Sequence, residues 1–217
     1  MSARGRHFAA QESIVDELID DAIDTAIDEA YEDELKVRHM PAWLDFLATI
    51  ATALVLAALI RIFIAQTYKV PSGSMLETIQ LNDRLVGEKV TLHWSEPVAG
   101  DIVTFDDPKG SGETLIKRVI ATEGQVIDLQ GGHVIVDGVE LDEPYTLGKP
   151  TEPINVRDEG QEDYISYPLT VPEGCIWVMG DNRVNSLDSR YFGPVSLDSV
   201  TSKALFIYWP PSDIKAL

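Results

Sequence analysis

Residues 133–141 read HVIVDGVEL, and this stretch decides what kind of fold the chain can form. Two short apolar runs flank Asp137 and Gly138, a dipeptide suited to the tight turn of a β-hairpin. Comparable runs lie on both sides of it, namely RLVGEKV, DIVTF, LIKRVIAT, QVIDL, CIWVMG and SKALFIYW. Apolar runs of this length, separated by turn residues, predict a mainly β domain of many short strands over residues 66–217.

One part of this domain has a different composition. Residues 143–173 are polar and contain five prolines. Proline lacks the N–H group that a strand donates to its neighbour, so it disfavours regular pairing. We therefore expect an extended, cap-like insertion around residues 143–173 with little regular structure.

A long apolar segment precedes the β domain. Residues 43–65 read WLDFLATIATALVLAALIRIFIA. As a helix they would extend about 34 Å, enough to cross a bilayer core of about 30 Å. Asp45 and Arg61 fall near the ends, where charge is tolerated, so we expect a transmembrane anchor. A buried core helix stays open as an alternative, whereas the acidic residues ahead of the segment are unlike the start of a cleaved signal peptide.

Residues 1–42 form an acidic leader. Eleven carboxylates and no Lys or Arg lie between Glu12 and Glu34, while apolar residues recur at steps of three and four. This period predicts an amphipathic helix. Two interpretations stay open, a regulatory helix with an unknown partner or a solvated leader that packs loosely on another part of the protein. The carboxylates argue against binding to an anionic membrane surface.

The composition excludes several classes of protein. The 217 residues include 36 Asp and Glu against 17 Lys and Arg, which gives a formal net charge of −19. Such a chain repels phosphate, so we expect no nucleic-acid partner. A single cysteine, Cys175, excludes an internal disulfide framework, and the four histidines lack metal-ligand spacing. We therefore expect no metal and no other cofactor.

Three clusters could carry chemistry. In the first, Pro71 precedes Ser72-Gly73-Ser74, a turn that can present a hydroxyl but is also ordinary loop composition. A serine nucleophile needs a base, and none of the histidines lies in a recognisable setting for one. The second cluster supplies Lys117, within the apolar run LIKRVIA. Burial there would lower the pKa of the lysine, as a base requires, unless the amine reaches water.

The third cluster is GDNRVNSLDSR, residues 180–190. It is dense in groups that form hydrogen bonds at short range. Taken alone, it is either a polar surface loop or a shell that orients a catalytic pair.

Together these clusters resemble the bacterial type I signal peptidase family. The likeness extends from the apolar segment to the C-terminus, through VPSGSM (70–75), GDIVTF (100–105), LIKRVIA (115–121), VDGVELDEPY (136–145), VMGDNRVNSLDSR (178–190) and RYFGPV (190–195). Several motifs in the same order are far more specific than any one of them. The resemblance implies a signal-peptidase-like β-barrel or sheet domain, preceded by the acidic helix and one transmembrane helix.

The resemblance also implies roles for individual residues. Ser74 would be the nucleophile and Lys117 the general base, while the Ser72 hydroxyl and the Ser74 backbone N–H would form an oxyanion hole. Ser186 would orient the lysine. The framework that holds the last motif would consist of Asp181, Asp188, Arg190 and Arg118, with Arg118 paired to Asp181.

The implied reaction is removal of signal peptides from exported preproteins by a serine endopeptidase. Such peptidases cut after sites with small residues at the first and third positions before the cut. Shallow apolar pockets would read these positions by excluding larger side chains. The candidate pocket walls are Tyr68, Val70, Met75, Ile79, Leu115 and Ile116.

The resemblance further implies a cell (plasma) membrane location with a single span in contact with lipid. Residues 1–42 would be cytoplasmic and residues 66–217 extracytoplasmic. Three features depart from the family pattern. Glu77 stands where proline is usual, Val184 stands where aspartate is usual, and ATEGQ (121–125) stands where Gly-Leu-Pro-Gly-Asp is common. If Glu77 lies near Lys117, its charge would raise the pKa of the lysine, the wrong direction for a base.

Three other functions are weighed against this one. A self-cleaving repressor with a similar Ser/Lys pair would need a DNA-binding module, and the leader is acidic rather than basic. An inactive relative that acts as an assembly factor, for example for pilins, would lack Ser74 or Lys117, and both are present. A non-enzymatic anchored β domain is the third.

Overall fold

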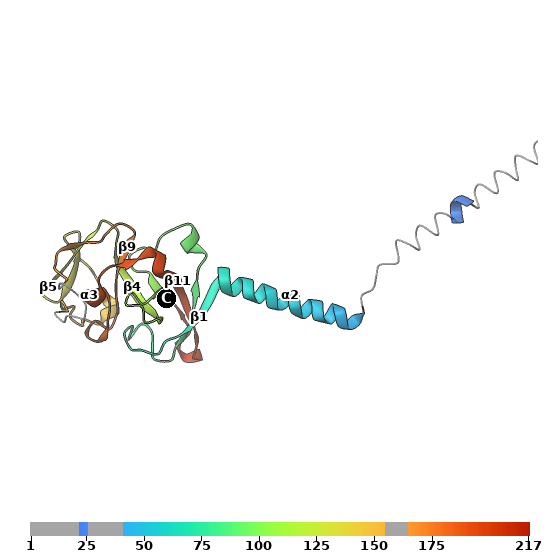
Figure 1. Ribbon diagram of the computed structural model, residues 1–217. Helices are drawn as coiled ribbons and strands as arrows, with labels where there is room; N and C mark the ends of the chain where they lie inside the picture. The colour runs from blue at the N-terminus through green and yellow to red at the C-terminus, as the bar shows by residue number, and fades with distance from the viewer. Residues whose placement is uncertain (1–21, 26–40, 155–164) are drawn as a thin grey trace, which may run out of the picture. The chain divides into compact units, whose positions relative to one another are not determined.

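The computed structural model describes residues 22–25, 41–154 and 165–217 (Figure 1). The chain divides into two compact units, residues 1–54 and 55–217, and the boundary falls within helix α2. The two units are described separately. Of the predicted leader helix, residues 22–25 are helical and exposed, and the remainder of residues 1–40 lies outside the described residues.

Helix α2 comprises Ala42–Phe63, close to the predicted span of residues 43–65. Phe46–Ile60 carries no charge and is rich in Leu and Ala, which favour a helix. The helix is long and apolar enough to cross a membrane, and none of its residues is buried. Its exposed apolar side chains are unlike those of a core helix in a water-soluble domain. It ends before strand β1, which begins at Ala65.

The larger sheet gives the catalytic candidates their positions. Its strand order is β1-β2-β11-β3-β4-β9-β10, with β12 paired to β11, and neighbouring strands are antiparallel. The strands are β1 (Ala65–Lys69), β2 (Arg84–Glu88), β3 (Ile102–Asp106), β4 (Thr114–Thr122), β9 (Cys175–Met179), β10 (Val195–Ser196), β11 (Val200–Trp209) and β12 (Lys215–Ala216).

The smaller sheet contains the hairpin that the sequence predicts. Its order is β7-β6-β5-β8, and the strands are β5 (Val126–Gln130), β6 (His133–Val136), β7 (Val139–Glu140) and β8 (Leu169–Thr170). Asp137 and Gly138 join β6 to β7 with φ angles of 52° and 80°, as a two-residue turn with two positive φ values requires. The predicted mainly β fold is confirmed.

The predicted insertion at residues 143–173 is partly regular. Strand β8 lies inside it and pairs with β5, because Leu169 packs against the apolar core beneath that sheet. Residues 155–164 of the insertion lie outside the described residues. The remaining short helices are η1 (Thr91–His93), η2 (Pro144–Thr146), η3 (Arg183–Asn185), α3 (Ser189–Phe192), η4 (Leu197–Ser199) and η5 (Pro211–Asp213).

Candidate active site

The turn that carries Ser74 is anchored from below by apolar side chains. Met75 and Ile79 are fully buried in a core cluster with Val70 and Leu85. The Ile79 backbone N–H donates to the Met75 carbonyl at 2.8 Å, which closes a helical turn directly after the serine. Burial of these side chains on both sides of Ser74 fixes the position of its hydroxyl relative to the sheet.

Lys117 reaches this hydroxyl from the middle of β4. Its Nζ lies 2.9 Å from Ser74 Oγ and 2.9 Å from the Ile116 carbonyl oxygen. Ser74 is 7% exposed and Lys117 is 4% exposed. The predicted pair therefore meets at hydrogen-bond distance in a site where both groups are nearly removed from water.

Burial sets the charge state of the lysine. Loss of solvation lowers the pKa of Lys117 to about 8, although the carboxylates of Asp188 and Asp181 partly oppose this shift. Glu77 is exposed and is not among the groups that act on the lysine. Glu77 therefore does not raise the pKa of Lys117.

Asn182 holds the turn that carries Ser74 through two hydrogen bonds to its backbone carbonyls. Its backbone N–H donates to the Ser74 carbonyl at 3.0 Å, and its Nδ2 donates to the Gly73 carbonyl at 2.9 Å. Its Oδ1 accepts a hydrogen bond from Lys149 at 3.1 Å. Sequence reasoning assigned no role to Asn182, because an asparagine in a polar run also fits a surface loop.

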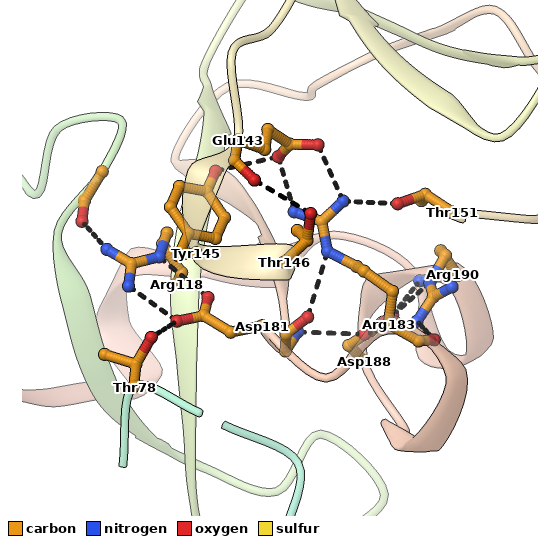
Figure 2. Close-up of polar contacts among 12 residues, drawn as sticks. Thr78, Arg118, Glu143, Tyr145, Thr146, Thr151, Asp181, Arg183, Asp188 and Arg190 are labelled. Atoms are coloured by element: carbon orange, nitrogen blue, oxygen red, sulfur yellow. Dashed lines mark hydrogen bonds and ion pairs between the residues drawn. The ribbon is translucent and has the colours of Figure 1, made fainter. Parts of the chain in front are cut away.

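The predicted contact between Arg118 and Asp181 is present (Figure 2). Arg118 Nε and Nη2 bind the two carboxylate oxygens at 2.8 and 2.7 Å, and Thr78 donates to the same carboxylate at 2.5 Å. Arg118 also stacks on Tyr145, with 4.1 Å from Cζ to the ring centroid. These contacts join the segment after Ser74, strand β4 and the last motif.

A second buried ion pair is one that sequence reasoning missed. Arg183 is 2% exposed and binds both oxygens of Glu143, at 2.9 and 2.5 Å (Figure 2). It also donates to Thr151 and to the Gly180 carbonyl. Arg183 belongs to the quoted motif, but its partner lies 40 residues earlier in the chain, so only the folded chain reveals the pair.

Asp188 and Arg190 form the third part of the framework. Arg190 Nε and Nη2 each lie 2.9 Å from an oxygen of Asp188. Asp188 also accepts the Gly180 backbone N–H at 3.0 Å, and Arg190 donates to the Arg183 carbonyl at 2.7 Å. Asp188 and Arg190 are both buried, and the Asp188 carboxylate is satisfied by donors, as burial requires.

Ser186 does not make the contact that the sequence predicts. Its buried Oγ has no hydrogen-bond partner among the described residues, so it is not bonded to Lys117. The hydroxyl instead lies over Gly180, where a Cβ atom would meet it at 2.3 Å and the Ser74 carbonyl at 2.5 Å. Ser186 is therefore close to the nucleophile turn, but the lysine amine is occupied by Ser74 and the Ile116 carbonyl.

A cleft of about 330 Å³ opens above the pair. Tyr68, Val70, Leu115 and Ile116 line it, as the sequence predicts, together with Ser72. Met75 and Ile79 do not line it, which corrects their interpretation as pocket walls. Both side chains instead pack in the core, where they anchor the turn that carries Ser74.

The two donors predicted for the oxyanion hole are free to bind a substrate oxygen. Ser72 is exposed at the cleft, and neither its hydroxyl nor the Ser74 backbone N–H is bonded to another described residue. A developing negative charge needs such unoccupied donors.

Val184, which departs from the family pattern, is 66% exposed and belongs to no core cluster.

A serine hydroxyl beside a desolvated lysine amine, at the edge of an open cleft, is the arrangement of a serine hydrolase that uses lysine as its base. The comparisons with known proteins agree. Residues 43–209 match the family model described as signal peptidase, peptidase S26. The chain belongs to this family.

Named relatives include a probable signal peptidase I-1 from Synechocystis, 40% identical, with 74% of this chain and 79% of the relative covered. A signal peptidase I from Leptolyngbya laminosa is 35% identical, with 77% of this chain and 80% of the relative covered. Signal peptidase I T from Bacillus subtilis is 31% identical, with 80% and 89% covered. A solved signal peptidase I from Enterococcus faecalis is 34% identical, covering 50% of this chain and 97% of its own, with a TM-score of 0.41.

Proposed function

We propose that the chain is a membrane-bound type I signal peptidase that removes signal peptides from exported preproteins, with Ser74 as nucleophile and Lys117 as general base. The observation that carries this proposal is the 2.9 Å contact between Lys117 Nζ and Ser74 Oγ in a buried site. The alternative of an inactive assembly factor has no feature of the site in its favour.

In the first half of the reaction, Ser74 Oγ attacks the carbonyl carbon of the scissile peptide bond, and neutral Lys117 takes the hydroxyl proton. The carbonyl oxygen becomes negative, and the Ser74 N–H and Ser72 hydroxyl stabilise it. Each such donor typically contributes about 3 kcal/mol to lowering the barrier. The intermediate then collapses to an acyl-enzyme, and Lys117 gives its proton to the departing amine of the mature protein.

The second half releases the signal peptide. Water attacks the ester carbonyl while Lys117, neutral again, takes a proton from it. Collapse of this intermediate breaks the bond to Ser74 Oγ, which recovers its proton from the lysine. The framework of Asp181, Asp188 and Arg190 holds the loop beside the pair through both halves, without a step of its own.

Specificity for small side chains follows from the walls of the cleft. Tyr68, Val70, Leu115 and Ile116 offer apolar surface but limited depth. A substrate segment in extended form would direct alternate side chains into this cleft. Large side chains at the first and third positions before the cut would then collide with its walls.

The proposed topology follows from the anchor and the reaction. Helix α2 crosses the membrane once, the leader (residues 1–42) lies in the cytoplasm, and residues 66–217 act on the outer face. The span of Ala42–Phe63 and its exposed apolar surface support this arrangement. In the cytoplasm the acidic leader would be either a regulatory helix that binds a partner or a solvated segment, as the sequence allows.

The direct test is cleavage of a preprotein by the detergent-purified chain, with the cut mapped by mass spectrometry. Wild type should cut after a small-x-small site, and Ser74→Ala and Lys117→Ala should each lose activity. Cleavage that survives in Lys117→Ala would contradict its role as base. No cleavage by a folded wild-type chain would contradict the proposed function.

A further inference from the structure

Four hydroxyl groups meet at one side of the cleft. They belong to Tyr68 on β1, Thr104 on β3, and Thr201 and Ser202 on β11. Thr104 Oγ1 lies 2.6 Å from Ser202 Oγ, 2.8 Å from Thr201 Oγ1 and 3.2 Å from Tyr68 Oη. Ser202 Oγ lies 3.1 Å from Tyr68 Oη. We call these four residues the hydroxyl cluster.

Gly87 on β2 makes room for this cluster. A Cβ atom there would lie 2.1 Å from Ser202 Oγ and 2.9 Å from Tyr68 Cε2. A glycine in a strand interior costs stability, so its presence is explained where another group must approach the backbone closely. Here the close approach brings the Tyr68 ring and the Ser202 hydroxyl together over β2.

The phenol proton of Tyr68 is the least satisfied donor of the cluster. Thr201 Oγ1 donates to the Thr104 carbonyl at 3.1 Å, and Thr104 and Ser202 can both donate to Tyr68 Oη. The remaining partner for the Tyr68 proton is Thr201 Oγ1 at 3.4 Å, the longest of the phenol's contacts. A phenol both donates and accepts, so Tyr68 can give this proton to an incoming oxygen.

Both Tyr68 and Thr104 line the cleft, and among the described residues neither is hydrogen-bonded to Ser74 or Lys117. In the pairing of β3 with β4, Thr104 lies opposite Ile116, one residue before Lys117. An extended substrate repeats the same side-chain direction every two residues, about 7 Å apart. Tyr68 and Thr104 share the cleft with Ser74 and Lys117. After the first residue before the cut, the third is the next whose side chain has the same direction, so it is the candidate to meet them.

We propose that Tyr68 hydrogen-bonds the side chain of a serine or threonine at the third position before the cut, so that the site prefers these residues over apolar ones of equal size. This inference rests on the proposed function and adds a polar preference to the exclusion of bulk. The hydroxyls of Thr104 and Ser202, which can both donate to Tyr68 Oη, orient the phenol.

The test compares Thr with Val at the third position, because the two side chains have nearly the same shape. Detergent-purified full-length wild type should cleave the Thr preprotein with a kcat/KM about fivefold higher than the Val preprotein, as one net hydrogen bond allows. In Tyr68→Phe this ratio should fall to about one. Tyr208→Phe, which removes a phenol outside the cleft, should keep the wild-type ratio.

Thr201→Val separates the phenol from the packing of the cluster. Tyr68 keeps its contacts with Thr104 and Ser202 in this variant, so the preference for Thr should persist. Equal loss of preference in Thr201→Val and Tyr68→Phe would overturn the proposal, as would equal cleavage of both preproteins by wild type. The first position before the cut is tested with Ser against Ala. If Tyr68→Phe changes the preference at the first position and leaves the preference at the third unchanged, the placement of Tyr68 is wrong. Absence of all cleavage by wild type would instead overturn the proposed function, and this inference with it.

Discussion

At the scale of single residues, Lys117 is held in a state that costs stability and permits chemistry. It lies on strand β4 within the run LIKRVIA and is 4% exposed, and burial lowers its pKa to about 8 from an ordinary value of 10.5. Between these two values the unfolded chain binds more protons than the folded chain, so folding becomes more favourable as pH rises. Below pH 8 the cost of burying this amine is complete.

Replacement of Lys117 by Met should therefore stabilise the chain near pH 7. The gap between the two pKa values corresponds to about 3 kcal/mol. The advantage of Lys117→Met over wild type should shrink as pH rises from 8 towards 10.5. Thermal unfolding in detergent across this range measures it. Lys69→Met, at an exposed lysine of the same cleft, is the matched control, and an advantage that does not change with pH would contradict the lowered pKa.

Asn182→Ala should slow the reaction more than it weakens substrate binding. The variant loses the donor to the Gly73 carbonyl but keeps the backbone donor to the Ser74 carbonyl. Partial release of the nucleophile turn should lower kcat by about tenfold with KM little changed, because small misplacements of a nucleophile are costly. Steady-state kinetics on a preprotein would show this. Lys149→Met removes only the contact to Asn182 Oδ1, so a loss as large as in Asn182→Ala would contradict the account.

At the scale of elements, two glycines in tight segments serve different ends. Gly138 has a φ of 80° in the β6–β7 turn, with open space around it. Gly180 follows β9, and a Cβ there would meet the Ser74 carbonyl at 2.5 Å. One glycine supplies a backbone conformation and the other supplies room beside the nucleophile turn.

The two substitutions by alanine should therefore separate stability from activity. Gly138→Ala should lower stability by about 1 kcal/mol through backbone strain and leave kcat/KM unchanged in the folded chain. Gly180→Ala should displace the Ser74 carbonyl and lower kcat/KM by about 100-fold. Thermal unfolding and preprotein cleavage, measured on both variants, check this. Similar kinetic losses in the two would show that position 180 has no special relation to Ser74.

The strands and the site contacts were predictable only in part, and the order of the strands in the sheets was not predicted. The Asp137-Gly138 dipeptide predicts a hairpin and the apolar run around Lys117 predicts a strand, because each prediction depends only on residues that are adjacent in the sequence. The meeting of Ser74 with Lys117 was accessible through the resemblance of whole motifs. Arg183 with Glu143 was not, since each alone fits a solvated loop and their contact depends on the folded sheet. Met75 and Ile79 illustrate the same limit, because an apolar residue beside a nucleophile fits either a wall or a core.

At the scale of the whole molecule, an acidic leader, an apolar helix and a β domain follow one another along the chain. The flanking charges leave the orientation of the helix nearly balanced, with Lys36 and Arg38 before it and Arg61 and Lys69 at its other end. The proposed orientation therefore rests on where signal peptides must be cut. It needs a test that does not depend on activity.

Site-directed labelling of intact cells provides that test. In a Cys175→Ser background, Ser111→Cys should react with a membrane-impermeant maleimide, because Ser111 is an exposed residue of the β domain. Ser2→Cys should react only after the cells are permeabilised. The opposite pattern would place the β domain in the cytoplasm and contradict the proposed topology.

The central claim is that a buried Lys117 with a lowered pKa takes the proton of Ser74 and so activates it. The most direct measurement is the pH dependence of kcat/KM for preprotein cleavage, which reports the ionisations of the free enzyme. The rate should rise with pH as Lys117 loses its proton and reach half its plateau near pH 8. A profile that is flat from pH 6 to 10, or that has its midpoint near 6.5 as histidine would give, would contradict the account.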